Sequence, residues 1–405
     1  MTEENPNLVI NQHSNINIEI NKGEEENSSI KLKKEVLNKD FYLKNKREYG
    51  IDLLRILAMF MVINTHLGNG SNFNKQQPIL SFKRYFFYFI YYWGRKCNIV
   101  FGMISWYVGL NSRNKLNSII SLIITSTIYS IILEIIYIKK NNKKYTILQY
   151  INILFPFSRN VFWYYTSYIG LFFFKPYINL IIKTISKKDS KKILIFIFIF
   201  FSLITSIFNS DAFGIQRYHS LFWLSIYYYY GAYIKMHGIF LEKYSKFIIL
   251  LINLFALLLN VLLIFLSELN IVKWNNNYYN FEGFKLHVNP LLIICSICEL
   301  IFFKDLNVYV FIKKIISIIS PSVFFVYILG FNFNTIEYYK IIIINQYNLL
   351  GIIMFFFYKN IYIASICIFI DYIRRLIFNF LNMNILFEKL SFRIEDLIAK
   401  FLQDN

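Results

Sequence analysis

Cysteine is scarce in this sequence, and its few cysteines are not spaced like a metal site or a disulfide framework. All four lie in apolar segments, and only Cys295 and Cys298 are close together. A structural zinc site needs a second pair of ligands, and the sequence shows none near this CxxC. We therefore expect the cysteines to pack in an apolar core, and we expect no metal.

The sequence also lacks the short motifs that mark common soluble enzyme classes. It contains no Walker loop and no GxGxxG, GxSxG or HExxH stretch. Their absence argues against ATPases, dinucleotide-binding enzymes, α/β hydrolases and zinc proteases. An early apolar stretch is missing too, because residues 1–45 are polar and rich in Asn, Glu and Lys. We expect a disordered cytoplasmic tail there and no signal peptide.

Acidic residues are outnumbered by basic residues, 24 to 43, which gives a formal charge of +19 at pH 7. Such a charge can indicate nucleic-acid binding. Here Lys and Asn fill short loops between apolar segments, and no soluble domain is left to present a basic face. The sequence therefore predicts no nucleic-acid partner.

Apolar residues dominate: they make up 56% of the chain, and the mean hydropathy is +0.44. This composition predicts an all-α polytopic membrane protein, a single bundle of about ten transmembrane helices in the lipid bilayer. The predicted spans are 51–67, 86–110, 117–138, 161–183, 192–209, 219–236, 245–267, 287–303, 311–331 and 349–371. Arg95 and Lys96 interrupt the second span. It is either one span, or an interfacial piece from Phe82 to Trp93 followed by a span that starts near Gly94.

The loops favour a multi-pass protein of the cell (cytoplasmic) membrane with both termini in the cytoplasm. Lys44, Lys46 and Arg47 precede the first span, and most Lys-rich loops fall on the same side, as the positive-inside rule requires. The loop 139–160 is the exception. Residues 46–380 are the predicted transmembrane domain, and residues 381–405 a short amphipathic tail on the membrane surface.

The first span carries three polar side chains in an apolar segment: Asp52, Arg55 and His66. Such residues usually face a bundle interior, a cavity or a substrate path. Eleven residues separate Arg55 from His66, so on a helix the two share one face, roughly 16 Å apart along the axis. Histidine can act as a general base, and arginine can hold an anionic or carbonyl group. A core histidine and a plain Asp52–Arg55 ion pair are the structural alternatives.

Other polar residues in or near the spans have weaker claims. Glu134, Glu299 and Asp371 fit a proton path or an interface equally well, and Asp371 has Arg374 and Arg375 as possible partners. The remaining histidines lie at span edges, in a loop or in the tail, where they are ordinary; we assign no role to His13, His219, His237 and His287.

The opening stretch also resembles a family signature. It reads YGIDLLRILAMFMVINTH, and it is similar to the first helix of the acyltransferase 3 family of integral membrane O-acyltransferases, surface-polysaccharide type. Later segments resemble later helices of that family, in order: CNIVFGMISWYVGL (97–110), NVFWYYTSYIGLFFFKPYINLII (160–182), YYYYGAYIKMHG (227–238), NPLLIICSICELIFFKDL (289–306), ISPSVFFVYILG (319–330) and FIDYIRRLIF (369–378). The resemblance covers about residues 48–380.

This resemblance implies a membrane acyltransferase that moves an acyl group, commonly acetyl, from an acyl-CoA to a hydroxyl. The acceptor would be a cell-envelope glycan or its lipid-linked precursor, and acetyl-CoA would be a substrate rather than a bound cofactor. His66 would be the catalytic histidine, as general base or acyl carrier, and Arg55 the signature arginine. The candidate substrate-binding residues are Asp52, Asn98, Ser105 and Trp163.

Two departures from the family pattern keep other functions open. Leu329 and Gly330 stand where the ninth span usually ends in Ile-His, and Trp106 stands where a glycine usually follows Ile-Ser. One alternative is therefore an acyltransferase-like protein without activity. Independently of these departures, ten spans with buried charges fit a transporter or flippase for an envelope glycan precursor equally well, although the sequence shows no inverted repeat and few helices broken by Gly or Pro.

Overall fold

The chain is almost entirely helical where its structure is described. The computed structural model describes residues 47–71, 77–109, 116–142, 144, 146–156, 162–209, 220–269, 273–274, 277–278, 281–332 and 348–403. One short antiparallel ribbon pairs β1 (Lys273–Trp274) with β2 (Asn277–Tyr278). The prediction of an all-α membrane protein is therefore confirmed, while the predicted tail, residues 1–45, lies outside the described residues.

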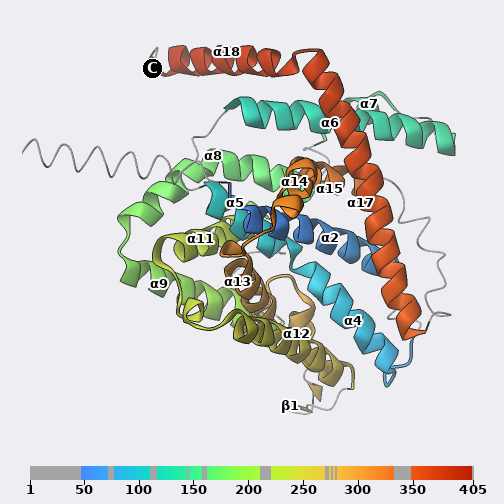
Figure 1. The fold of residues 1–405 in the computed structure, drawn as a ribbon, viewed down its shortest axis with the longest axis vertical. Coiled ribbons are helices and arrows are strands. Elements are labelled where there is room, and N and C mark those ends of the chain that lie inside the picture. The colour runs from blue at the N-terminus through green and yellow to red at the C-terminus, as the bar shows by residue number, and fades with distance from the viewer. Residues whose placement is uncertain are drawn as a thin grey trace, which may run out of the picture. The chain divides into compact units, whose positions relative to one another are not determined.

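The helices belong to one unit, Tyr49–Asn405 (Figure 1). In chain order they are α2 (Tyr49–Ser71), α4 (Phe82–Arg95), α5 (Cys97–Gly109), α6 (Leu116–Asn141), α7 (Ile147–Leu154), α8 (Trp163–Thr184), α9 (Lys187–Phe196), the π-helix η2 (Ile197–Ile204), α10 (Thr205–Phe208), α11 (Leu221–His237), η3 (Phe240–Lys243), α12 (Lys246–Glu268), η4 (Phe281–Lys285), α13 (Pro290–Lys304), α14 (Val310–Ile319), η5 (Ser320–Ser322), α15 (Val323–Asn332), α17 (Leu349–Phe380) and α18 (Met383–Gln403).

Seven helical stretches among the described residues are long and apolar enough to cross a membrane. They are Tyr49–Asn69, Leu116–Lys139, Lys187–Phe208, Lys246–Glu268, Glu282–Lys304, Val310–Gly330 and Leu349–Phe380. The predicted count of ten is thus not confirmed. The other three predicted spans are helical, but α4 and α5 are separated at Lys96, α11 has only 17 residues, and α8 contains Lys175, Pro176 and Asn179.

Helix α2 lies in the middle of the helical unit (Figure 1). It contacts α4, α5, α13, α14, α15 and α17, and 72% of its most apolar window is buried. Its contact with α4 is close, because a Cβ atom added at Gly94 would lie 2.9 Å from both the Met61 carbonyl oxygen and the Thr65 hydroxyl. Most of α2 is therefore covered by other helices.

Helix α11 forms a second buried element beside α5, α8 and α9. A Cβ atom at Gly231 would come within 2.2 Å of the Met103 carbonyl oxygen, so a glycine is required where α11 crosses α5. Around it, the aromatic residues of α11 pack inside the protein, as the Tyr228 ring does edge-on against Trp106 at 4.4 Å. This packing holds α5 rigidly between α2 and α11.

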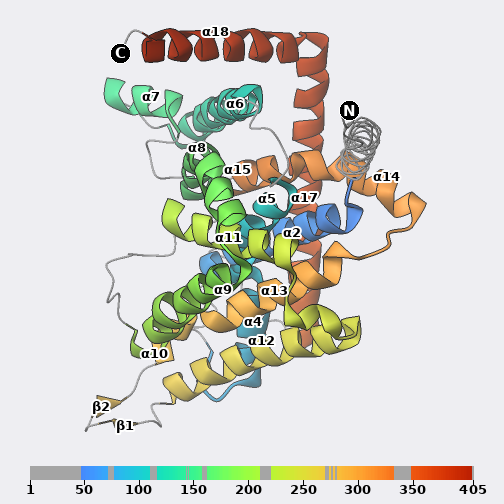
Figure 2. The same ribbon diagram turned by 90° about the vertical axis from the view of Figure 1, so that its left-hand side faces the viewer.

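The C-terminal helix α18 lies crosswise to α17 (Figure 2). The turn between them contains Asn382 at φ 52, a left-handed conformation that asparagine tolerates. Phe387 is buried while Phe392, Leu397 and Phe401 are exposed, and α18 also contacts α6. An amphipathic helix of this kind suits a membrane surface, and that location stays a prediction.

Candidate functional site

A cavity of about 740 Å³ lies among the central helices. Its walls come from α2, α5, α8, the residue His287 before α13, and the segment η5–α15. From α2, the lining residues follow a helical spacing along one face: Arg55, Met59, Val62, His66 and Asn69, joined by Thr65. The predicted shared face of Arg55 and His66 is confirmed, and that face borders the cavity.

Arg55 is held in place from behind by Asp52 and Ser320. The Arg55 Nη1 donates to Asp52 Oδ1 at 2.8 Å, and the Ser320 hydroxyl donates to the same oxygen at 3.1 Å. Arg55 and Ser320 line the cavity, whereas Asp52 is buried and does not. These contacts support the interpretation of Asp52 as the residue that positions Arg55, and they do not place it against a substrate.

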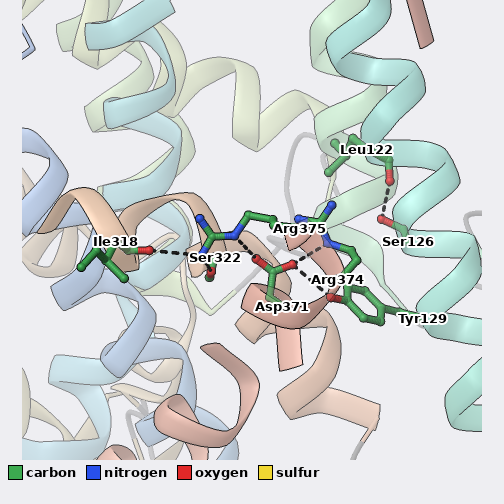
Figure 3. Close-up of polar contacts among 8 residues, drawn as sticks. All are labelled: Leu122, Ser126, Tyr129, Ile318, Ser322, Asp371, Arg374 and Arg375. Atoms are coloured by element: carbon green, nitrogen blue, oxygen red, sulfur yellow. Dashed lines mark hydrogen bonds and ion pairs between the residues drawn. The ribbon is translucent and has the colours of Figure 1, made fainter. Parts of the chain in front are cut away.

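The turn η5 that carries Ser320 is fixed on its other side by a second Asp–Arg pair (Figure 3). The Ser322 hydroxyl accepts a hydrogen bond from Arg375 Nη2 at 3.1 Å, and Arg375 Nε lies 3.4 Å from Asp371 Oδ2. Asp371 is fully buried and also accepts from Arg374 Nε at 2.8 Å and from the Tyr129 hydroxyl at 3.0 Å. Asp371 therefore ties α17 to α6 and η5, which answers the open question about its partners.

Asn98, Ser105 and Trp163 all border the same cavity, as does His66. The Ser105 hydroxyl donates to the Phe101 carbonyl at 2.8 Å, a bond within its own helix. Of the six candidate site residues predicted from the sequence, the structure thus brings together five in one cavity, with Asp52 directly behind. Their roles toward a substrate stay predictions.

The sequence analysis missed two further basic cavity residues, Lys175 and His287. Lys175 belongs to α8, and its side chain is half-buried. It packs against Gly109 of α5, since a Cβ atom added at Gly109 would lie 3.1 Å from the Lys175 Cε atom. His287, to which the sequence analysis assigned no role, also borders the cavity. A lysine within an apolar run was the available signal for Lys175.

The two histidines that border the cavity, His66 and His287, lie near the junction of α4 and α5. Thr65 packs on Gly94, so His66 lies beside the junction where α5 begins with Cys97. His287 lies near it too, because its Nδ1 lies 3.0 Å from the Arg95 carbonyl oxygen at that junction.

Lys175 lies at the far end of α5. From Cys97 to Gly109, α5 runs about 18 Å along the cavity, and Lys175 lies beside Gly109. Arg55 lies roughly 16 Å from His66 along α2, which contacts α5. We infer that Arg55 and Lys175 share one end and the two imidazoles the other. No carboxylate appears among the described lining residues.

Gly330 stands where the acyltransferase 3 pattern usually has a histidine. Gly330 is not a lining residue, and a Cβ atom there would lie 3.8 Å from Ile363 of α17. Among the described residues, no group of three or more His, Cys, Asp or Glu side chains is placed to hold a metal ion.

No family model, curated protein or solved structure matches this chain. The resemblance to the acyltransferase 3 family therefore stays a prediction from the motifs.

Proposed function

We propose that this protein is a membrane O-acyltransferase that transfers an acyl group, acetyl in the simplest case, from an acyl-CoA to a hydroxyl of an envelope glycan or its lipid-linked precursor. One observation carries the proposal: Arg55 and His66 border the same cavity from one face of a buried helix. A cation at one end and an imidazole at the other match a donor with anionic phosphates and a reaction that must move a proton.

Arg55 and Lys175 are the groups for the donor. Guanidinium and ammonium groups bind phosphate oxygens well, and no carboxylate among the described lining residues competes with them. In the predicted topology, this end faces the cytoplasm, where acyl-CoA is made. The thioester would then extend from the cationic end toward the imidazoles.

His66 carries the chemistry, either by taking the proton of the attacking hydroxyl or by accepting the acyl group itself. In both cases His66→Ala removes the reacting nitrogen. We expect glycan acylation to fall by at least about a hundredfold, the usual size of a lost acid–base group. Arg55→Ala is expected to weaken use of the donor while leaving residual turnover.

The test measures acyl groups on the surface glycan by mass spectrometry in a deletion strain complemented with each variant. His237→Ala is the matched control, because His237 packs on Tyr233 with ring centroids 5.1 Å apart and does not border the cavity. Full acylation with His66→Ala at normal protein levels would refute the proposal.

The same experiment separates the transporter alternative. Loss of acyl groups with the polymer still exported supports the enzyme. Loss of the polymer itself from the deletion strain supports a transporter or flippase, and a deletion that changes neither supports an inactive relative.

A further inference from the structure

We propose that His287 is a second catalytic imidazole in this site, which takes the proton of the attacking hydroxyl while His66 carries the acyl group. The inference rests on the proposed acyl transfer. It starts from a residue in a loop between η4 and α13 that borders the cavity at its imidazole end.

The hydrogen bond of His287 fixes which of its ring nitrogens can accept a proton. Its Nδ1 lies 3.0 Å from the Arg95 carbonyl oxygen, and a carbonyl can only accept. Nδ1 therefore carries the proton, and in the neutral ring Nε2 is the basic nitrogen. When Nε2 takes a proton, the bond from Nδ1 to the carbonyl strengthens, which stabilises the resulting cation.

The loop that carries His287 is fixed by hydrogen bonds to several helices. The backbone carbonyl of His287 accepts a hydrogen bond from the Tyr227 hydroxyl at 3.3 Å, and the Val288 carbonyl accepts one from the Ser202 hydroxyl. Asn289 is fully buried, donates to Asn260 and to the Phe284 carbonyl, and caps α13. Four elements, α4, α11, η2 and α12, thus fix the backbone around this imidazole, as pre-organised catalysis requires.

His287 and His66 are both tied to the junction of α4 and α5, and both border the cavity. Gly94 packs on Thr65, the neighbour of His66, and Arg95 holds His287. One histidine cannot carry an acyl group on its nitrogen and use that nitrogen as a base at the same time. Two imidazoles at one end of a cavity can divide these roles.

The reaction balances with these two groups. The unprotonated nitrogen of His66 attacks the thioester carbonyl, a C–N bond forms, the C–S bond breaks and the thiolate leaves. The acceptor hydroxyl oxygen then attacks the acyl carbon, His287 Nε2 takes the hydroxyl proton, and the C–N bond breaks. His287 returns this proton to the thiolate, so thioester and alcohol become ester and thiol.

His287→Asn tests the assignment, because the asparagine amide can still donate to the Arg95 carbonyl but cannot act as a base. Two activities are measured in the full-length protein with acetyl-CoA. One is transfer to the native acceptor in membranes from a strain that lacks the gene. The other is formation of acetyl hydroxamate with hydroxylamine, a nucleophile that needs no base. The His66→Ala variant measures the background, which is the direct reaction of hydroxylamine with acetyl-CoA.

We expect His287→Asn to lower transfer to the hydroxyl acceptor by about 10²- to 10⁴-fold while hydroxamate formation stays near the wild-type rate. Tyr227→Phe, which removes one anchor of the loop but keeps the imidazole, should reduce transfer only a few-fold. His287→Gln replaces His287→Asn if the shorter side chain lowers protein yield.

Three outcomes would overturn the assignment. Wild-type transfer with His287→Asn would show that His287 is not the base. Parallel loss of transfer and hydroxamate in His287→Asn would make it a structural residue. Wild-type protein that acylates the glycan but forms no hydroxamate above background would exclude the acyl-His66 intermediate while leaving acyl transfer intact. A different result, wild-type protein that is inactive in both assays, would refute the proposed function itself.

Discussion

At the scale of the residue, Asp52 and Arg55 act as one group. The carboxylate of Asp52 receives hydrogen bonds from both Arg55 and Ser320, and only the latter two reach the cavity. The arginine alone would have many rotamers, and the ion pair restricts them before any ligand binds. This arrangement supports the proposal that Arg55 faces the substrate and that Asp52 positions it.

Asp52→Asn should therefore impair donor binding more than the chemical step. It keeps the shape of the side chain but removes the charge, so Arg55 loses its orientation toward the cavity. We expect the KM for acetyl-CoA to rise about tenfold, roughly 1.4 kcal/mol, with a smaller change in kcat. Initial rates in membranes measure both values. Ser320→Ala, which removes only a neutral partner, should have a smaller effect, and an unchanged KM in Asp52→Asn would contradict this role.

At the scale of the element, the junction between α4 and α5 depends on a buried ion pair. Lys96, which separates the two helices, is fully buried, and its Nζ lies 2.6 Å from Glu299 Oε1 of α13. Neither residue borders the cavity, and the pair links the junction to α13. Because Arg95 directly precedes it, the same junction places the carbonyl that orients His287.

Lys96→Met should destabilise the protein strongly, because it leaves the Glu299 carboxylate buried and unpaired. The expected loss is about 3–5 kcal/mol, while the double variant Lys96→Met/Glu299→Leu should recover most of it. Thermal unfolding in detergent measures both. Lys192→Met, which breaks the exposed pair with Asp189, should leave the unfolding temperature nearly unchanged, because solvent screens such a pair. A double variant as unstable as the single one would refute this explanation.

At the scale of the whole molecule, the sequence predicts what depends on local pattern. The spacing of Arg55 and His66 on one helical face, and the break at Lys96, follow from residues close together in the chain. The position of His287 does not, because it results from contacts with Arg95 and Tyr227 far away in sequence. Only seven of the ten predicted spans meet the length and hydropathy of a membrane helix among the described residues. The other three contain polar residues or breaks, which a helix packed against other helices tolerates better than one that faces lipid.

The orientation of the whole molecule in the membrane is the remaining prediction, and it decides from which side the donor enters. The native cysteines are all free and buried, and Cys97 borders the cavity, so labelling of the unaltered protein is measured as background before single cysteines are added. Leu80, between α2 and α4, is 79% exposed on the predicted outer side, and Lys188, at the start of α9, is exposed on the predicted cytoplasmic side. Leu80→Cys should react with a membrane-impermeant maleimide in intact cells, and Lys188→Cys only after permeabilisation. The reverse labelling would place the imidazole end toward the cytoplasm, and a donor entering from there would then meet His66 before Arg55.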